Sequence, residues 1–106
     1  MSAAVVPAAR PAAERGRLRI ADRVLVRLTE RAAGQALGGS GAVRRVAVTG
    51  AGDPVRLNLG VELPFPADLA VLATEVRVAV AAELATLTGR PVGEVVVVVE
   101  RLVPTV

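Results

Sequence analysis

The residue types that covalent or metal-assisted chemistry needs are largely missing from this chain. Its 106 residues include no cysteine and no histidine, and all 13 basic residues are arginine. Zinc sites, haem ligation by His or Cys, disulfides and Ser–His or Cys–His nucleophile pairs therefore cannot be built. The Ser and Thr hydroxyls have neither a histidine base nor a lysine to activate them. We expect a protein that is not an enzyme, with no catalytic residue, no cofactor and no metal.

The ten acidic residues do not suggest acid–base chemistry either. Asp22 and Asp68 lie at predicted helix starts, Asp53 lies in a predicted turn, and Glu75 and Glu83 lie on a helical face. A general acid–base pair needs two groups whose environments drive their pKa values apart. These carboxylates are spaced singly among arginines, so we interpret them as solubilising charge.

Arginines form the most suggestive charge pattern. Residues 1–31 hold seven arginines against three acids, a local net charge of +4, whereas the remainder nets −1. An acidic partner, an anionic lipid surface or a nucleic acid could use such a face. The simpler interpretation is a solvated helix face, and a single aromatic residue, Phe65, disfavours base stacking. The residues of this candidate anionic-partner face are Arg23, Arg27, Arg31, Arg44 and Arg45.

A glycine-rich stretch, Gly38, Gly39, Ser40 and Gly41, has the G-x-x-G spacing with which KH domains clamp a nucleic-acid backbone. In this chain it joins a predicted helix to a predicted strand, and no basic residue lies inside it. We therefore interpret it as a linker.

The apolar periodicity predicts five elements. A helix begins near Ala21 or Asp22 and stops at Gly38, with Leu25 on its apolar stripe. A longer helix has Pro66 at its first position and stops at Gly89. The expected core stripe of this second helix is Leu69, Leu72, Val76, Val80, Leu84 and Leu87. The strands are expected at 43–49, 55–63 and 95–99, with Pro64 ending the second. The order helix-strand-strand-helix-strand predicts an α+β fold in two layers, a small three-stranded sheet with two helices on one face. Residues 1–15 are expected to form a disordered Ala- and Pro-rich arm, and residues 16–106 a single domain.

The last predicted strand is a run of five valines. Because side chains alternate across a strand, Val96 and Val98 point away from the side that Val95, Val97 and Val99 share. Both faces of this strand are therefore apolar, and the outer one needs a cover. Val96 and Val98 are candidates for self-association or partner docking. The alternative cover is intramolecular, by the N-terminal arm or by the C-terminal Leu102 and Val103.

Three stretches within residues 16–103 resemble the alkaline-shock family, the envelope stress response proteins of Gram-positive bacteria. They are GRLRIADRVLVRLTERAA, VRLNLGVEL and LATLTGRPVGEVVVVVERLV. The resemblance implies a non-enzymatic cytoplasmic protein that self-assembles, gathers at the membrane through a membrane-anchored partner and supports envelope homeostasis.

The expected location and partners agree with that resemblance. Pro7 interrupts the N-terminal apolar stretch and no basic residue precedes Arg10, so no secretory signal is predicted. Charged residues interrupt the best candidate for a membrane span. We expect a cytoplasmic protein that associates with the membrane through a partner, the partners being further copies or homologous domains and a membrane-anchored protein. A small nucleic-acid-binding module and direct binding to anionic lipid remain as alternatives.

Overall fold

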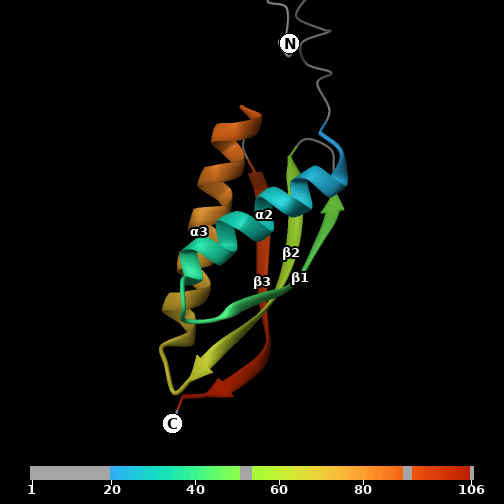
Figure 1. The fold of residues 1–106 in the computed structure, drawn as a ribbon. Coiled ribbons are helices and arrows are strands. Elements are labelled where there is room, and N and C mark those ends of the chain that lie inside the picture. Colours follow the sequence, from blue (N-terminus) through green and yellow to red (C-terminus); the bar gives the residue numbers. More distant parts are fainter. Residues whose placement is uncertain (1–19, 51–53, 90–91, 106) are drawn as a thin grey trace, which may run out of the picture.

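A computed structural model describes residues 20–50, 54–89 and 92–105, which form the expected α+β fold (Figure 1). The expected disordered arm at 1–15 and the turn around Asp53 lie outside the described residues. The order of elements is the predicted one, helix-strand-strand-helix-strand. These elements are α2 (Asp22–Leu37), β1 (Ala42–Gly50), β2 (Val55–Phe65), α3 (Leu69–Thr88) and β3 (Val92–Pro104).

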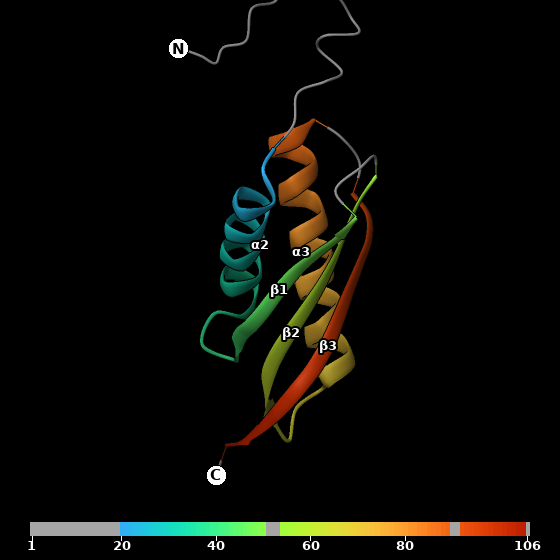
Figure 2. The ribbon, with the colours of Figure 1, turned by 90° about the vertical axis from the view of Figure 1, so that its right-hand side faces the viewer.

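The sheet has the strand order β1-β2-β3, and both helices cover one of its faces (Figure 2). β1 pairs with β2 in antiparallel fashion, whereas β2 and β3 run parallel. Parallel strands need a crossover, and α3 supplies it with 20 residues, a length of about 30 Å that returns the chain along the sheet. We call the face that the helices leave uncovered the outer face.

The first helix, α2, begins and ends where the sequence predicts. Ala21 is the capping residue and Asp22 lies in the first turn, where a carboxylate interacts favourably with the helix dipole. Leu25, Ala32 and Leu37 are buried on its inner side. Gly38 ends the helix with a positive φ of 58°, and its N–H donates to the carbonyl oxygen of Gly34.

The second helix, α3, begins later than expected and buries one residue fewer near its C-terminal end. Pro66 lies outside the helix, and Asp68 is its capping residue, with a carboxylate that accepts a 3.1 Å hydrogen bond from the Val71 N–H. Leu87, expected in the core stripe, is 50% exposed because it lies near the helix end, beyond the last buried residue, Leu84. Gly89 stops the helix in the left-handed conformation, as predicted.

β2 runs through Pro64 to Phe65, so the prediction that Pro64 ends the strand is wrong. The pairing of β1 with β2 finishes at Ala42 and Glu62, two residues before the proline. Beyond that point β2 has a partner only in β3, where Pro64 is in register with Val103. A proline is tolerated where one side of a strand requires no backbone donor.

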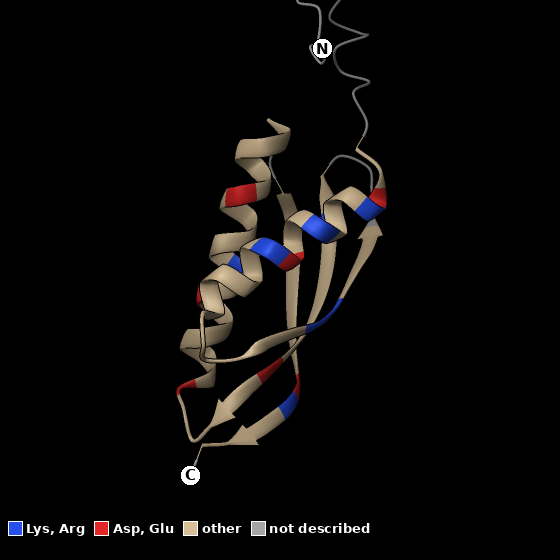
Figure 3. Ribbon diagram, viewed as in Figure 1, with Lys and Arg blue, Asp and Glu red and all other residues tan. Residues whose placement is uncertain are grey.

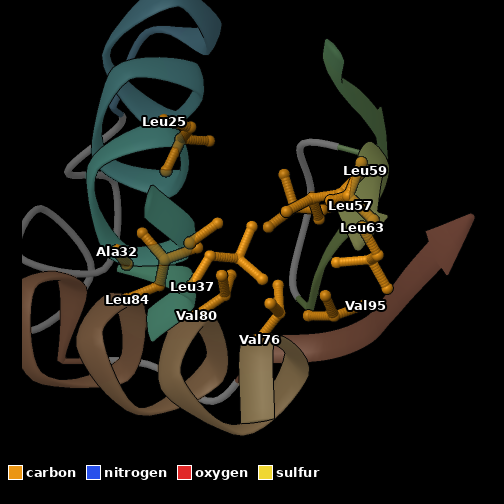
Figure 4. Packing of buried hydrophobic residues seen from close by; sticks show 12 residues of the cluster. Leu25, Ala32, Leu37, Leu57, Leu59, Leu63, Val76, Val80, Leu84 and Val95 are labelled. Atoms are coloured by element: carbon orange, nitrogen blue, oxygen red, sulfur yellow. The ribbon is translucent and has the colours of Figure 1, made fainter. Parts of the chain in front are cut away.

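The core lies between the helices and the inner face of the sheet (Figure 4). Four alternate residues of β2 are almost completely buried, and leucines and valines of both helices point toward them. The only buried polar side chain among the described residues is Thr29 of α2. The fully buried residues of β2 and α3 are Leu57, Leu59, Val61, Leu63, Val76, Val80 and Leu84.

Neither described helix is long and apolar enough to cross a membrane.

Candidate interaction surface

The two valines singled out from the sequence lie on the outer face, as the strand alternation requires. Val96 is 37% exposed and Val98 is 45% exposed, whereas Val95 on the inner face is 8% exposed. Val96 is in register with Asn58 of β2, and Val98 with Gly60. We call these two exposed valines the valine strip. On β2 the strip has as neighbours a polar side chain, Asn58, and a glycine, Gly60.

One of the two intramolecular covers proposed for this strip is wrong. Leu102 and Val103 do not fold back over the valines, because they continue β3 itself, which extends to Pro104. Both are exposed, at 43% and 37%. The register with Leu63 and Pro64 explains the extension, since the unexpectedly long β2 offers backbone partners to these residues. The other cover, the N-terminal arm, lies outside the described residues.

Irregularities in both neighbouring strands bring charged residues together next to the valine strip. In β1 the register shifts between Val43 and Arg45, which makes Arg44 an extra residue. In β3 it shifts between Val99 and Arg101, which makes Glu100 an extra residue. Bulges of this kind change the direction in which side chains point. Both flank the same part of β2, and the charged residues that meet there form what we call the bulge cluster: Arg44, Arg45, Glu62 and Glu100.

Glu100 is the centre of the bulge cluster. Arg44 approaches it at 3.8 Å from Nε, Arg45 donates a hydrogen bond to it through Nη2, and Arg44 also binds Glu62, with 3.2 Å between Nη1 and Oε1. The Glu100 carboxylate lies too close to the position of a Cβ on Gly60 for a side chain to fit there, so the missing side chain at Gly60 makes room for it. Each such partly exposed pair stabilises the fold by about 0.2–1 kcal/mol.

The five arginines of the candidate anionic-partner face do not form one face. Arg44 and Arg45 lie at the outer sheet surface, where two carboxylates compensate their charge. Arg23, Arg27 and Arg31 are exposed on α2, in the helix layer. Two acidic segments lie among the basic ones along that helix (Figure 3). The geometry therefore separates the arginines that the sequence grouped.

The glycine-rich loop borders a shallow hollow of about 250 Å³ at the end of the sheet. Gly39, Ser40 and Gly41 line it together with Glu62, Leu63 and Val103. A carboxylate and apolar side chains are poor ligands for a phosphate backbone, which supports the linker interpretation of this loop. Among the residues that the structure describes, no three acidic side chains gather in a group able to hold a metal ion.

Sequence reasoning missed the two acidic members of the bulge cluster. Nothing in the local sequence singles out Glu62 and Glu100, although they are the counter-charges of Arg44 and Arg45. One signal was available in Gly60, because a glycine inside an alternating strand indicates a bulge or a close approach of another group. Which group approaches it could not be inferred without the register of β3.

Comparison of the chain with protein-family models, with curated proteins and with solved structures finds no match.

Proposed function

We propose that this protein is a non-enzymatic, self-associating scaffold of the cell envelope stress response, recruited to the cytoplasmic side of the membrane by a membrane-anchored partner. The observation that carries the self-association is the pair of exposed valines, Val96 and Val98, on the outer face of a long edge strand. The envelope role and the membrane-anchored partner rest on the likeness of residues 16–103 to the alkaline-shock family.

The charge around the valine strip favours contact between identical molecules. In the bulge cluster two arginines balance two glutamates, so its formal net charge is zero. Two copies that bring these surfaces together would therefore meet little like-charge repulsion. A strongly basic surface would instead favour an acidic partner or a nucleic acid.

The valines alone support only weak association. Complete burial of a valine stabilises by about 1.5–3 kcal/mol, and roughly two fifths of each side chain is still exposed. The four valines of two copies would thus contribute about 2–5 kcal/mol, whereas millimolar affinity requires about 4 and micromolar affinity about 8 kcal/mol. Stable assembly must therefore use further contacts around the strip.

Size-exclusion chromatography with light scattering tests the surface. We expect the wild type to self-associate and the Val96→Glu, Val98→Glu double variant to remain monomeric, because four buried carboxylates would meet in the contact. The matched control is Val71→Glu with Val78→Glu, which changes two exposed valines of α3. Equal association of the two double variants and the wild type would contradict the assigned surface.

Cell fractionation tests the recruitment. The protein is expected in the membrane fraction of its native cells and in the soluble fraction of a foreign bacterial host that lacks the membrane-anchored partner. Membrane association in both hosts would favour direct binding to anionic lipid instead, which flotation with anionic and neutral vesicles would then distinguish.

A further inference from the structure

The two edges of the sheet differ in their fitness to pair with another strand. An edge strand presents unpaired backbone N–H and C=O groups, and natural proteins protect such edges with charges and bulges. Both edge strands have two register irregularities. In β1 one of them lies within the strand, at the charged Arg44 and Arg45, whereas in β3 they lie on either side of the stretch from Glu94 to Val99. β3 pairs regularly with β2 from Glu94 to Val99 and has neither a charge nor a proline between Val95 and Val99. The β3 edge is therefore the open one.

We propose that β3 pairs in antiparallel fashion with β3 of a second copy across a two-fold axis, joining two three-stranded sheets into one six-stranded sheet. The inference rests on the self-association proposed above and specifies its geometry. Backbone hydrogen bonds along the edge supply the contacts that the exposed valines lack by themselves. A two-fold axis perpendicular to the sheet reverses the direction of the second strand and so makes the pairing antiparallel.

The valine run defines the register. Residues opposite each other must lie on the same face of the joined sheet, because a slip of one residue would turn every side chain to the wrong side. With the axis at Val97, Val95 faces Val99 of the second copy and Val96 faces its Val98. A shift of two residues in either direction would place Glu94 or Glu100 opposite a valine, so that apolar cross-strand pairs would be lost. Only the register centred on Val97 pairs all five valines with valines.

The charges at the ends of the run complement each other in this register. Glu94 and Arg101 both lie on the outer face, in register with Arg56 and Glu62 of β2. Both are exposed, and the part of the chain that the structure describes shows no ion pair for either. Glu100 is the extra residue of the bulge and is held over Gly60 by Arg45. Glu94 of one copy therefore meets Arg101 of the other, twice in each dimer.

Charge exchange tests this pairing. Glu94→Arg alone and Arg101→Glu alone should each weaken self-association at least about fivefold, because two attractive pairs become repulsive. An equimolar mixture of the two single variants should associate as the wild type does, since every contact between unlike copies is then attractive. The double variant should also recover. The matched controls, Glu75→Arg and Arg77→Glu on the exposed side of α3, should leave association unchanged.

Engineered cysteines provide a second test that does not alter charge, because the chain has no cysteine of its own. Residues directly opposite in an antiparallel pair have Cα atoms about 4.5–5.5 Å apart, within the range of a disulfide. Val96→Cys mixed with Val98→Cys should therefore form a cross-linked heterodimer much faster than either variant cross-links with itself. Circular dichroism of each variant confirms that the fold is retained.

The outcomes separate this inference from the proposed function. A wild type that stays monomeric would contradict both the proposed self-association and the β3 pairing. A wild type that self-associates, with single charge variants that associate equally well and with no preference for the mixed cysteine pair, would overturn the β3 pairing and leave the self-association standing. That result would indicate contact between outer faces instead of between strand edges.

Discussion

Thr29 is completely buried on α2, and replacing it with valine should stabilise the protein. Within the described residues its hydroxyl oxygen has no hydrogen-bond partner. A buried polar group without a partner has lost its hydrogen bonds to water and gained none in exchange. Valine has nearly the same shape, so the substitution removes the hydroxyl without opening a cavity.

The magnitude follows from the desolvation of one hydroxyl. Leaving such a group unsatisfied costs about 1–3 kcal/mol, and threonine and valine have similar helix propensities. We therefore expect Thr29→Val to raise the free energy of unfolding by about 1–2 kcal/mol. In a domain of this size each kcal/mol corresponds to a rise of about 4–8 °C in Tm.

Urea unfolding followed by circular dichroism measures this change, with calorimetry for Tm. The control is Thr74→Val, because Thr74 is exposed on α3 and its hydroxyl is accessible to water, so the free energy should change by less than about 0.5 kcal/mol. If Thr29→Val lowers the stability while Thr74→Val leaves it unchanged, the hydroxyl makes a favourable bond and the reasoning is refuted.

Three further predictions concern two glycines of close approach, the start of α3 and the arginines. Gly41→Ala should destabilise by about 1–3 kcal/mol, because a Cβ there would lie 2.5 Å from the backbone oxygen of Glu62. Gly60→Ala should cost less, since the flexible Glu100 side chain can move away; the reverse order in urea unfolding would argue against the assigned contacts. Asp68→Ala should cost about 1 kcal/mol through loss of the α3 cap, and an unchanged Tm would refute the capping role. Neither RNA nor DNA should bind in a filter assay at about 50 mM salt, and binding that falls steeply with salt would contradict the separation of the arginines.

The helices could be predicted because their signals are local. Gly38 and Gly89 stop α2 and α3 as the sequence indicates, since a glycine adopts the positive φ of these helix ends without strain. The apolar spacing likewise located the buried Leu25 and Leu84. The alternation of the valines also predicted the outward direction of Val96 and Val98, because it depends only on the period of a strand.

The bulge cluster could not be predicted because it depends on pairing between distant segments. The register between β2 and β3 places Glu100 over Gly60, 40 positions away in the chain. The full length of β3 has the same origin, since the continuation of β2 through Pro64 offers partners to Leu102 and Val103. Local propensity contains no information on such registers, so the ion pairs that compensate the charges of Arg44 and Arg45 could not be predicted either.

The molar mass of the wild type as a function of concentration tests the central claim, that this protein acts by associating through its outer valine strip and β3 edge. Light scattering from about 1 µM to about 1 mM spans the affinities that the surface supports. We expect a mass that rises with concentration from the 10.8 kDa monomer to the dimer or beyond. A mass that stays at the monomer value throughout would contradict it.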